Sequence, residues 1–287
     1  MIAESELIIN EDGSVFHLHL KPEQLADRIV LCGDPARVAI IAGYFDSKEC
    51  DISSREFRTI TGTYKRKRIS VVSHGIGCDN MDIVINELDA LANIDFKTRT
   101  IRPDFHQLTM VRIGTSGGLQ PFTPIGSYVA AEKSIGFDGV IYFYKDNEKI
   151  RDRRLEDELI PQLGWNITGI RPYIVSAEEN LINQIACDDI IRGITIAANG
   201  FYGPQGRELR LKLSDPKLNN KIESFNFENR QITNYEMESS ALAGLATMMG
   251  HRAMTVCCII AGRYNKNMNT DYKDSLPVLI EKVLDRI

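Results

Sequence analysis

Several short runs of almost entirely apolar residues constrain how this chain can fold. The clearest occupy residues 28–32, 108–111 and 253–260. A strand that is apolar on both faces belongs to a sheet that is covered on both sides, as in α/β proteins. Between these runs lie segments such as 80–91, in which apolar residues recur at helical spacing. The alternation of the two patterns predicts an α/β fold with helices on both faces of a sheet.

The remaining elements follow from the same two patterns, and no repeat, low-complexity segment or linker divides the chain. Residues 57–64 and 68–72 lie on either side of a charged turn, which predicts a hairpin. Further strands are expected at 127–131, 173–175 and 190–198, and helices at 35–45, 155–163, 178–185, 239–249 and 277–287. Residues 15–20 fit a short strand or an extended arm, and the polar stretch 95–107 fits a surface excursion. We therefore expect one domain spanning residues 1–287.

Composition limits the classes of function. The 287 residues are 43% hydrophobic and 25% charged, with a formal net charge of -5, which is typical of a soluble globular protein. A mildly acidic chain lacks the broad basic face that nucleic-acid binding needs. The six cysteines are scattered without a CxxC pair, so we expect reduced thiols in a cytoplasmic protein. Because there is neither a bilayer-length apolar run nor a recognisable signal sequence, we expect no membrane partner.

The first candidate binding site follows the apolar run 108–111. There the chain continues as RIGTSGG, whose glycines let the backbone come close to a ligand. Arg112 supplies a fixed cation, and Thr115 and Ser116 supply hydroxyls. At the C-terminal end of a strand in an open α/β sheet, this set favours an anion such as phosphate. An ordinary strand-to-loop turn is the alternative.

A second glycine turn, at Gly33, precedes the helix expected at 35–45. Asp34 fits a helix cap and Pro35 fits the first helical turn, while Arg37 adds a cation one turn into the helix. Backbone N–H groups at a helix N-terminus bind anions readily. A routine strand–helix junction explains the same residues, so both interpretations stay open.

The loop 201–207, with the sequence FYGPQGR, combines an aromatic ring with an amide and a cation. Phe201 can stack on a planar heterocycle, and Gln205 and Arg207 together match the polar edge of a pyrimidine. Loops also carry glutamine and arginine for solubility, so the pattern on its own is weak.

Two carboxylates, Glu236 and Glu238, precede a small apolar helix. A carboxylate accepts two hydrogen bonds at once, which suits the vicinal hydroxyls of a sugar; alternatively, the pair stabilises the N-terminus of the helix. The apolar run 253–260 leads to Arg263, where a cation is either a ligand or a solvated charge. His17 and His74 are further candidates, although single histidines are more often structural.

Several classes of enzyme lose support because their motifs are missing. The sequence holds no metal-ligand spacing, no Walker lysine after a glycine loop, no GxSxG and no GxGxxG. We therefore expect no metal site, and we disfavour metal hydrolases, P-loop nucleotidases and dinucleotide-dependent oxidoreductases.

Taken together, eight segments resemble the nucleoside phosphorylase family, and within it the uridine phosphorylases. They are VFHL at 15–18, LCGDPARV at 31–38, SREF at 54–57, GIG at 75–77, RIGTSGG at 112–118, FYGPQGR at 201–207, NYEMESS at 234–240 and the strand-end Arg263. The resemblance covers nearly the whole chain. It implies a three-layer α/β/α fold with a central mixed, partly closed β-sheet. It also implies nucleotide salvage by reversible phosphorolysis of uridine to uracil and ribose 1-phosphate, without an organic cofactor.

The resemblance assigns a role to each matching position. Phosphate binding falls to Gly33, Arg37, Arg55, Arg112 and Thr115. Ribose binding falls to His17, Glu236, Met237 and Glu238. Uracil binding falls to Ser116, Phe201, Gln205, Arg207, Ile260 and Arg263. Arg112, Arg207 and Glu238 carry the catalytic roles.

Two of these residues match positions that family members lend to a neighbouring subunit. Arg55 would reach the neighbour's phosphate and His17 the ribose 5′-hydroxyl. The resemblance therefore implies a homo-oligomer, a dimer at minimum, and it allows a monovalent cation between subunits. The excursion 95–107 resembles the longer version found in dimeric animal enzymes.

Three positions depart from the bacterial pattern. His74, Cys78 and Gly262 stand where threonine, glycine and asparagine are usual. Related purine phosphorylases instead place an acid that protonates the base at the position of Gly262. The missing acid, together with Gln205 and Arg207, favours a pyrimidine over a purine, because polar groups left unpaired reject the wrong base. The alternatives are a purine or methylthio-nucleoside phosphorylase or nucleosidase, and a nucleoside-binding relative with weak or no turnover.

Overall fold

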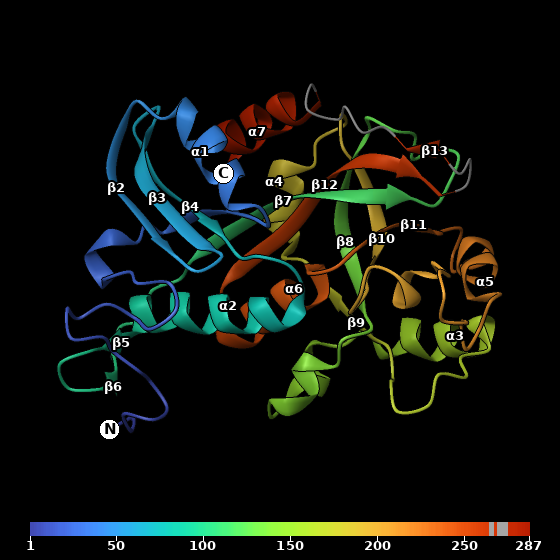
Figure 1. Cartoon of the computed structure of the whole chain (residues 1–287), viewed down its shortest axis with the longest axis horizontal. Coiled ribbons are helices and arrows are strands. Elements are labelled where there is room, and N and C mark those ends of the chain that lie inside the picture. The colour runs from blue at the N-terminus through green and yellow to red at the C-terminus, as the bar shows by residue number, and fades with distance from the viewer. Residues whose placement is uncertain (264–266, 269–274) are drawn as a thin grey trace.

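Strand β7 (Thr109–Gly118) is the centre of the sheet, and three other strands pair with it (Figure 1). β12 (Arg252–Gly262) runs parallel to β7 along its whole length. On the opposite edge, β1 (Arg28–Cys32) pairs in parallel with β7 only as far as Arg112. The last two residues of β7 pair antiparallel with β11 (Ile232–Glu236). The sheet therefore splits along this edge of β7, between the end of β1 and the pairing with β11.

On one side of this split the strands close on themselves. β12 also pairs with β8 (Tyr128–Gly136), β8 pairs with β10 (Ile191–Ala197), and β10 pairs with β11, which returns to β7. On the other side the sheet stays open, and β1 is followed by β4 (Lys67–Ser73), β3 (Phe57–Tyr64) and β2 (Ser47–Ser54). The mixed, partly closed sheet implied by the resemblance is confirmed.

Helices cover this sheet on both faces (Figure 1). One face packs against α1 (Pro35–Ile41), α4 (Glu179–Ile185) and α7 (Ser275–Arg286) through a shared apolar core. The other face packs against α2 (Cys78–Asn93) and α6 (Ser239–Met249) through a second core. The α/β class and its three layers are therefore confirmed.

Smaller elements complete the part of the chain that the computed structural model describes, which is residues 1–263, 267–268 and 275–287. A third core joins the closed part of the sheet to two further helices, α3 (Arg153–Leu163) and α5 (Leu218–Ser224). The short strands are β5 (Ile94–Asp95), β6 (Thr100–Ile101), β9 (Tyr173–Ser176) and β13 (Asn267–Met268). The 3-10 helices are η1 (Pro22–Gln24), η2 (Ala42–Tyr44), η3 (Val140–Phe143), η4 (Asn147–Ile150) and η5 (Gly203–Gln205). Within the described ranges, no helix combines the length and apolar character needed to cross a membrane.

Most expected elements are present with shifted ends, but four predictions were incomplete or wrong. β2, β11 and α5 were not predicted, because their sequences are polar and show little periodicity. The glycine-rich segment after residue 111 is not a loop, since β7 continues to Gly118. The predicted helix 35–45 ends at Ile41, and η2 follows it. Residues 15–20 form a turn, not a strand, with one isolated bridge at Val15.

Close packing explains why β7 ends in glycine. A Cβ atom on Gly118 would lie 2.4 Å from the backbone oxygen of Thr123, so Gly118→Ala must displace the backbone of that turn. We expect this substitution to lower the free energy of unfolding by roughly 1–3 kcal/mol in urea titrations. Gly43→Ala is the matched control, because a Cβ on Gly43 would meet nothing within 4 Å. Equal stability of the two variants would contradict the packing argument.

Candidate active site

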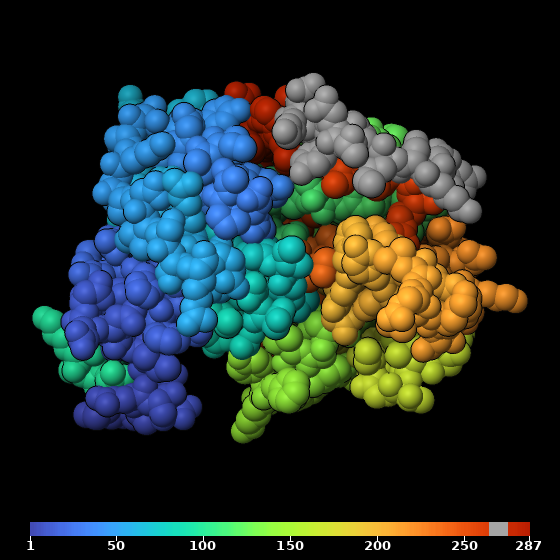
Figure 2. Space-filling view, in the orientation of Figure 1, coloured from blue at the N-terminus to red at the C-terminus, as the bar shows by residue number. Residues whose placement is uncertain are grey.

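A cavity of about 1180 Å³ opens where the sheet splits at β7. In Figure 2 the surface is hollowed between the teal of α2 and the amber segment that follows residue 200. Most of the predicted site residues line this cavity: Gly33, Arg37, Arg112, Thr115, Ser116, Phe201, Gln205, Arg207, Glu236, Met237, Glu238, Ile260 and Arg263. One cavity therefore brings together the segments that the sequence assigned to phosphate, ribose and base.

The turn after β1 forms the floor of one end of the cavity. The Asp34 carboxylate accepts a hydrogen bond from the Ala36 N–H at 2.8 Å, which caps α1 as predicted. Gly33 packs so tightly that a Cβ on it would lie 3.0 Å from the Gly75 carbonyl oxygen. Arg37 is buried and donates to the Ile113 carbonyl at 3.3 Å. Glycine and a buried cation thus meet at this end, as an anion site requires.

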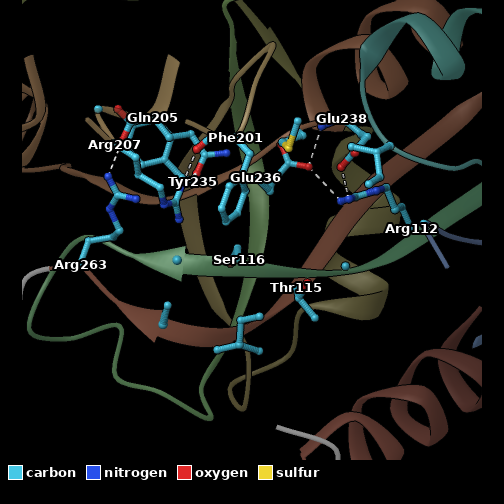
Figure 3. A pocket seen from close by; sticks show the side chains of 18 of the residues that line it. Arg112, Thr115, Ser116, Phe201, Gln205, Arg207, Tyr235, Glu236, Glu238 and Arg263 are labelled. Carbon is cyan, nitrogen blue, oxygen red and sulfur yellow. Dashed lines mark hydrogen bonds and ion pairs between the residues drawn. The ribbon is translucent and has the colours of Figure 1, made fainter. Parts of the chain in front are cut away.

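Arg112 lies at the opposite end of the site from Arg207 and is only 4% exposed (Figure 3). Its Nη1 donates to Glu236 at 2.9 Å, its Nη2 donates to Glu238, and its Nε donates to Nε2 of His74 at 3.1 Å. Burial opposes the charge, but the two carboxylates outweigh it and raise the pKa of Arg112. The guanidinium is therefore a permanent cation held in a fixed plane.

The two carboxylates have different surroundings. Glu236 accepts hydrogen bonds from the N–H groups of Glu238 and Ser239 and from the Ser239 hydroxyl, so it also stabilises the start of α6. This contact supports the helix-terminus interpretation for Glu236. Glu238 instead accepts from the Gly77 N–H at 2.7 Å, and burial raises the pKa of its carboxyl. Glu238 is thus the carboxylate with fewer structural partners.

The other end of the cavity carries two arginines around an amide (Figure 3). The Arg207 guanidinium lies 3.8 Å from the centre of the Phe201 ring, and its Nη1 donates to Oε1 of Gln205 at 2.6 Å. Arg263 donates to the Gln205 carbonyl. Burial, with the nearby charge of Arg263, lowers the pKa of Arg207 to about 10. This end therefore offers a stacking ring and several charged donors.

Ser116 is held by a residue that the sequence prediction missed. Asn234 on β11 donates to the Ser116 hydroxyl at 3.0 Å and accepts from Thr195 on β10 at 2.9 Å. The motif NYEMESS included Asn234, but a buried asparagine gives no periodic signal that would mark it.

Other lining residues were also missed. Tyr235 on β11 donates its hydroxyl to Asn219, which in turn donates to the Gln205 carbonyl at 3.2 Å. Asn219 and Glu223 belong to α5, which extends the wall of the cavity beyond the predicted base-binding loop. Finding them requires knowing that α5 packs beside β11.

Two predicted residues, Arg55 and His17, do not line this cavity. The Arg55 guanidinium lies over the Phe16 ring at 5.7 Å. The Nδ1 of His17 lies 2.6 Å from Glu87, which also accepts from the Leu18 N–H at 2.8 Å. Glu87 therefore holds the arm containing His17 against α2, outside the cavity.

The three departures from the family pattern lie close to this cavity. His74 is fully buried behind Arg112, and Cys78 is buried with its Sγ 3.2 Å from the Met237 carbonyl oxygen. Gly262 lines the cavity at the end of β12 and carries no acid. In the described ranges, no group of three or more histidine, cysteine, aspartate or glutamate side chains is arranged to hold a metal ion.

Comparison with protein families decides the classification. The model of a family described as "Phosphorylase superfamily" matches residues 27–284. This chain belongs to the phosphorylase superfamily. The match includes every residue that lines the cavity, and it begins ten residues after His17.

Several members of the superfamily are similar to this chain over most of their length. The uridine phosphorylase of Thermococcus kodakarensis is 31% identical over 259 residues, which cover 88% of this chain and 79% of that protein. A DeoD-type purine nucleoside phosphorylase of Proteus mirabilis is 24% identical, with 93% and 97% covered. The crystal structure of a Trypanosoma brucei nucleoside phosphorylase, described as showing uridine phosphorylase activity, matches with a TM-score of 0.89 and 30% identity over 98% of both chains.

The surroundings of His74 predict a pH dependence of stability. Burial, with Arg112 and Arg37 nearby, lowers the pKa of His74 well below its ordinary 6.5. The unfolded chain therefore binds a proton below about pH 6.5 that the folded chain excludes, which weakens folding by up to about 1.4 kcal/mol per pH unit. His74→Gln removes this contribution. In urea titrations from neutral pH to about pH 5, wild type should lose more stability than the variant; parallel losses would contradict the assignment.

Proposed function

We propose that this protein is a uridine phosphorylase, which converts uridine and phosphate reversibly into uracil and ribose 1-phosphate. The observation that carries the proposal is one cavity with two different ends. Buried Arg37 and Arg112 lie at one end, and the residues that match a pyrimidine, Gln205 and Arg207, lie at the other. The similarity to uridine phosphorylases over 88% of this chain supports the same conclusion. The protein is accordingly a pentosyltransferase.

In this reaction the bond between ribose C1′ and uracil N1 breaks, and its electron pair leaves with the base. A phosphate oxygen supplies the new bond to C1′. Arg207 and Gln205 at the base end stabilise the charge that grows on uracil, an effect realised mainly in the transition state. Arg37 and Arg112 hold phosphate at the other end, with Gly33 and Thr115. Positioning two reactants in this way lowers the barrier by roughly 7–11 kcal/mol.

The ribose belongs between these ends. Glu238 and Met237 line the cavity there, and we assign the sugar hydroxyls to Glu238. Glu236 contributes mainly through Arg112 and the start of α6. The mechanism needs no covalent intermediate and no organic cofactor.

The position of Arg55 and His17 supports a shared site. Both lie outside the cavity of their own subunit, so we propose a homodimer at minimum, in which each subunit lends them to the other. A monovalent cation between the subunits stays a prediction. We also propose that the protein acts in nucleotide salvage in the cytoplasm, where its six free cysteines would remain reduced.

A panel of nucleosides tests the activity directly. We expect uracil to form from uridine only when inorganic phosphate is present, and inosine and adenosine to react far more slowly. Chromatography of the free base and of the pentose phosphate measures both products. Phosphate-independent uracil release would identify a nucleosidase, faster inosine turnover would identify a purine enzyme, and tight uridine binding without turnover would identify a binding protein.

Mixing variant subunits tests the shared site. Arg37→Ala disables the cavity of its own subunit, whereas Arg55→Ala disables the neighbour's site. Each variant should therefore lose phosphorolysis alone, and a mixture refolded together should regain part of it, because one site then combines an intact cavity with an intact Arg55.

The control mixture combines Arg37→Ala with Thr115→Ala. Both residues line the cavity of the same subunit, so no hybrid site is intact and no activity should return. Recovery in both mixtures, or in neither, would contradict the exchange of Arg55 between subunits.

A further inference from the structure

His74 is an imidazole buried completely behind the candidate phosphate site. It follows β4 directly, and its backbone N–H donates to the Cys32 carbonyl at 2.9 Å, beside the Gly33 turn. Its Cε1 would lie 3.7 Å from a Cβ atom on Gly33. The ring therefore supports the floor of the cavity from behind and does not line it.

The hydrogen bond to Arg112 fixes the protonation state of this ring. The Nε of Arg112 can only donate, so Nε2 of His74 must accept and carries no proton. In the neutral ring the proton then sits on Nδ1. Among the described residues Nδ1 has no hydrogen-bond partner. A buried polar atom without a partner is unfavourable, so the Nδ1 of this histidine costs stability. The hydrogen bond that the ring does make is the one from Arg112 to its other nitrogen, Nε2.

The hydrogen bond from Nε to His74 constrains the orientation of the Arg112 guanidinium. The guanidinium is planar, and acceptors lie on three sides: His74 at Nε, Glu236 at Nη1 and Glu238 at Nη2. A free arginine would instead tend to turn Nε and Nη2 together onto one carboxylate as a bidentate pair. A neutral acceptor at Nε blocks that arrangement, and among the described residues one Nη2 proton stays without a partner for a ligand.

We propose that His74 is a positioning residue for phosphate use, which keeps Arg112 turned toward the cavity by accepting a hydrogen bond from its Nε. The inference rests on the proposed function, since it takes Arg112 as a phosphate ligand. It also gives a role to a residue that departs from the threonine expected at this position.

Two nearly matched substitutions test the proposal. In His74→Gln the side-chain oxygen can reach the place of Nε2 and accept from Arg112. In His74→Asn the shorter amide reaches only the place of Nδ1. We expect His74→Asn to raise the phosphate KM about 10- to 100-fold, as for loss of a hydrogen bond to a charged group, and to change the uridine KM much less. His74→Gln should stay within a few-fold of wild type.

A structural role alone would give a different pattern. His251 is another buried histidine, hydrogen-bonded to Leu108 and Asp89, and it does not line the cavity, so His251→Asn serves as the control for general destabilisation. It should lower the thermal unfolding temperature without changing the phosphate KM. Equal phosphate KM values for the Gln and Asn variants of His74, or an unchanged value in His74→Asn, would overturn the proposal.

Titration calorimetry with inorganic phosphate tests the role of His74 separately from the proposed uridine phosphorylase activity. If wild type binds phosphate but releases no uracil from uridine, the proposed function fails. The phosphate affinities of the two His74 variants still decide the role of His74. Weaker binding by the Asn variant alone supports it, and equal binding by both rejects it.

Discussion

A single buried cation, Arg112, joins the elements that surround the cavity. It connects β7 to the end of β11 through Glu236, to the start of α6 through Glu238 and to the end of β4 through His74. A charge inside a protein needs partners, and loss of one partner of a buried ion pair typically costs about 3–5 kcal/mol. The same contacts that make this charge tolerable therefore also fix the geometry of the site.

The split in the sheet explains why the site lies where it does. β1 leaves β7 at Arg112 and β11 joins only at Gly117, so the backbone between them faces a gap and not a neighbouring strand on that edge. Ligands of open α/β folds bind at such switch points, beyond the carboxyl ends of strands. Thr115 and Ser116 occupy this gap and line the cavity. The strand order thus leaves backbone N–H and C=O groups on this edge of β7 without the strand partner that they would otherwise have.

The sequence predicted the parts of this arrangement that local patterns encode. Apolar runs marked β1, β7 and β12, and the motifs marked Gly33, Arg112, Gln205 and Glu238. What it could not reveal depends on contacts between distant segments. Asn234 bonds to Ser116, and Asn219 bonds to Gln205. These contacts could be identified only once the positions of β11 and α5 were known, because no sequence periodicity marks a polar residue as buried. The glycine-rich end of β7 was mistaken for a loop, since close packing, as of Gly118 against Thr123, favours glycine inside a strand as well.

The closed ring of strands also affects how the chain folds during synthesis. β7 is flanked by strands that come from both the first and the last parts of the sequence, so most contacts that complete the sheet join residues far apart. Proteins with such non-local pairing fold slowly, and during synthesis the N-terminal parts emerge first. β12 (Arg252–Gly262) leaves the ribosome long after β7 (Thr109–Gly118), and until it docks, β7 lacks its partner on one whole edge. A nascent chain therefore carries β7 with one apolar edge open while the residues between β7 and β12 are made, and protection of that edge by a chaperone would matter more here than in a locally connected fold.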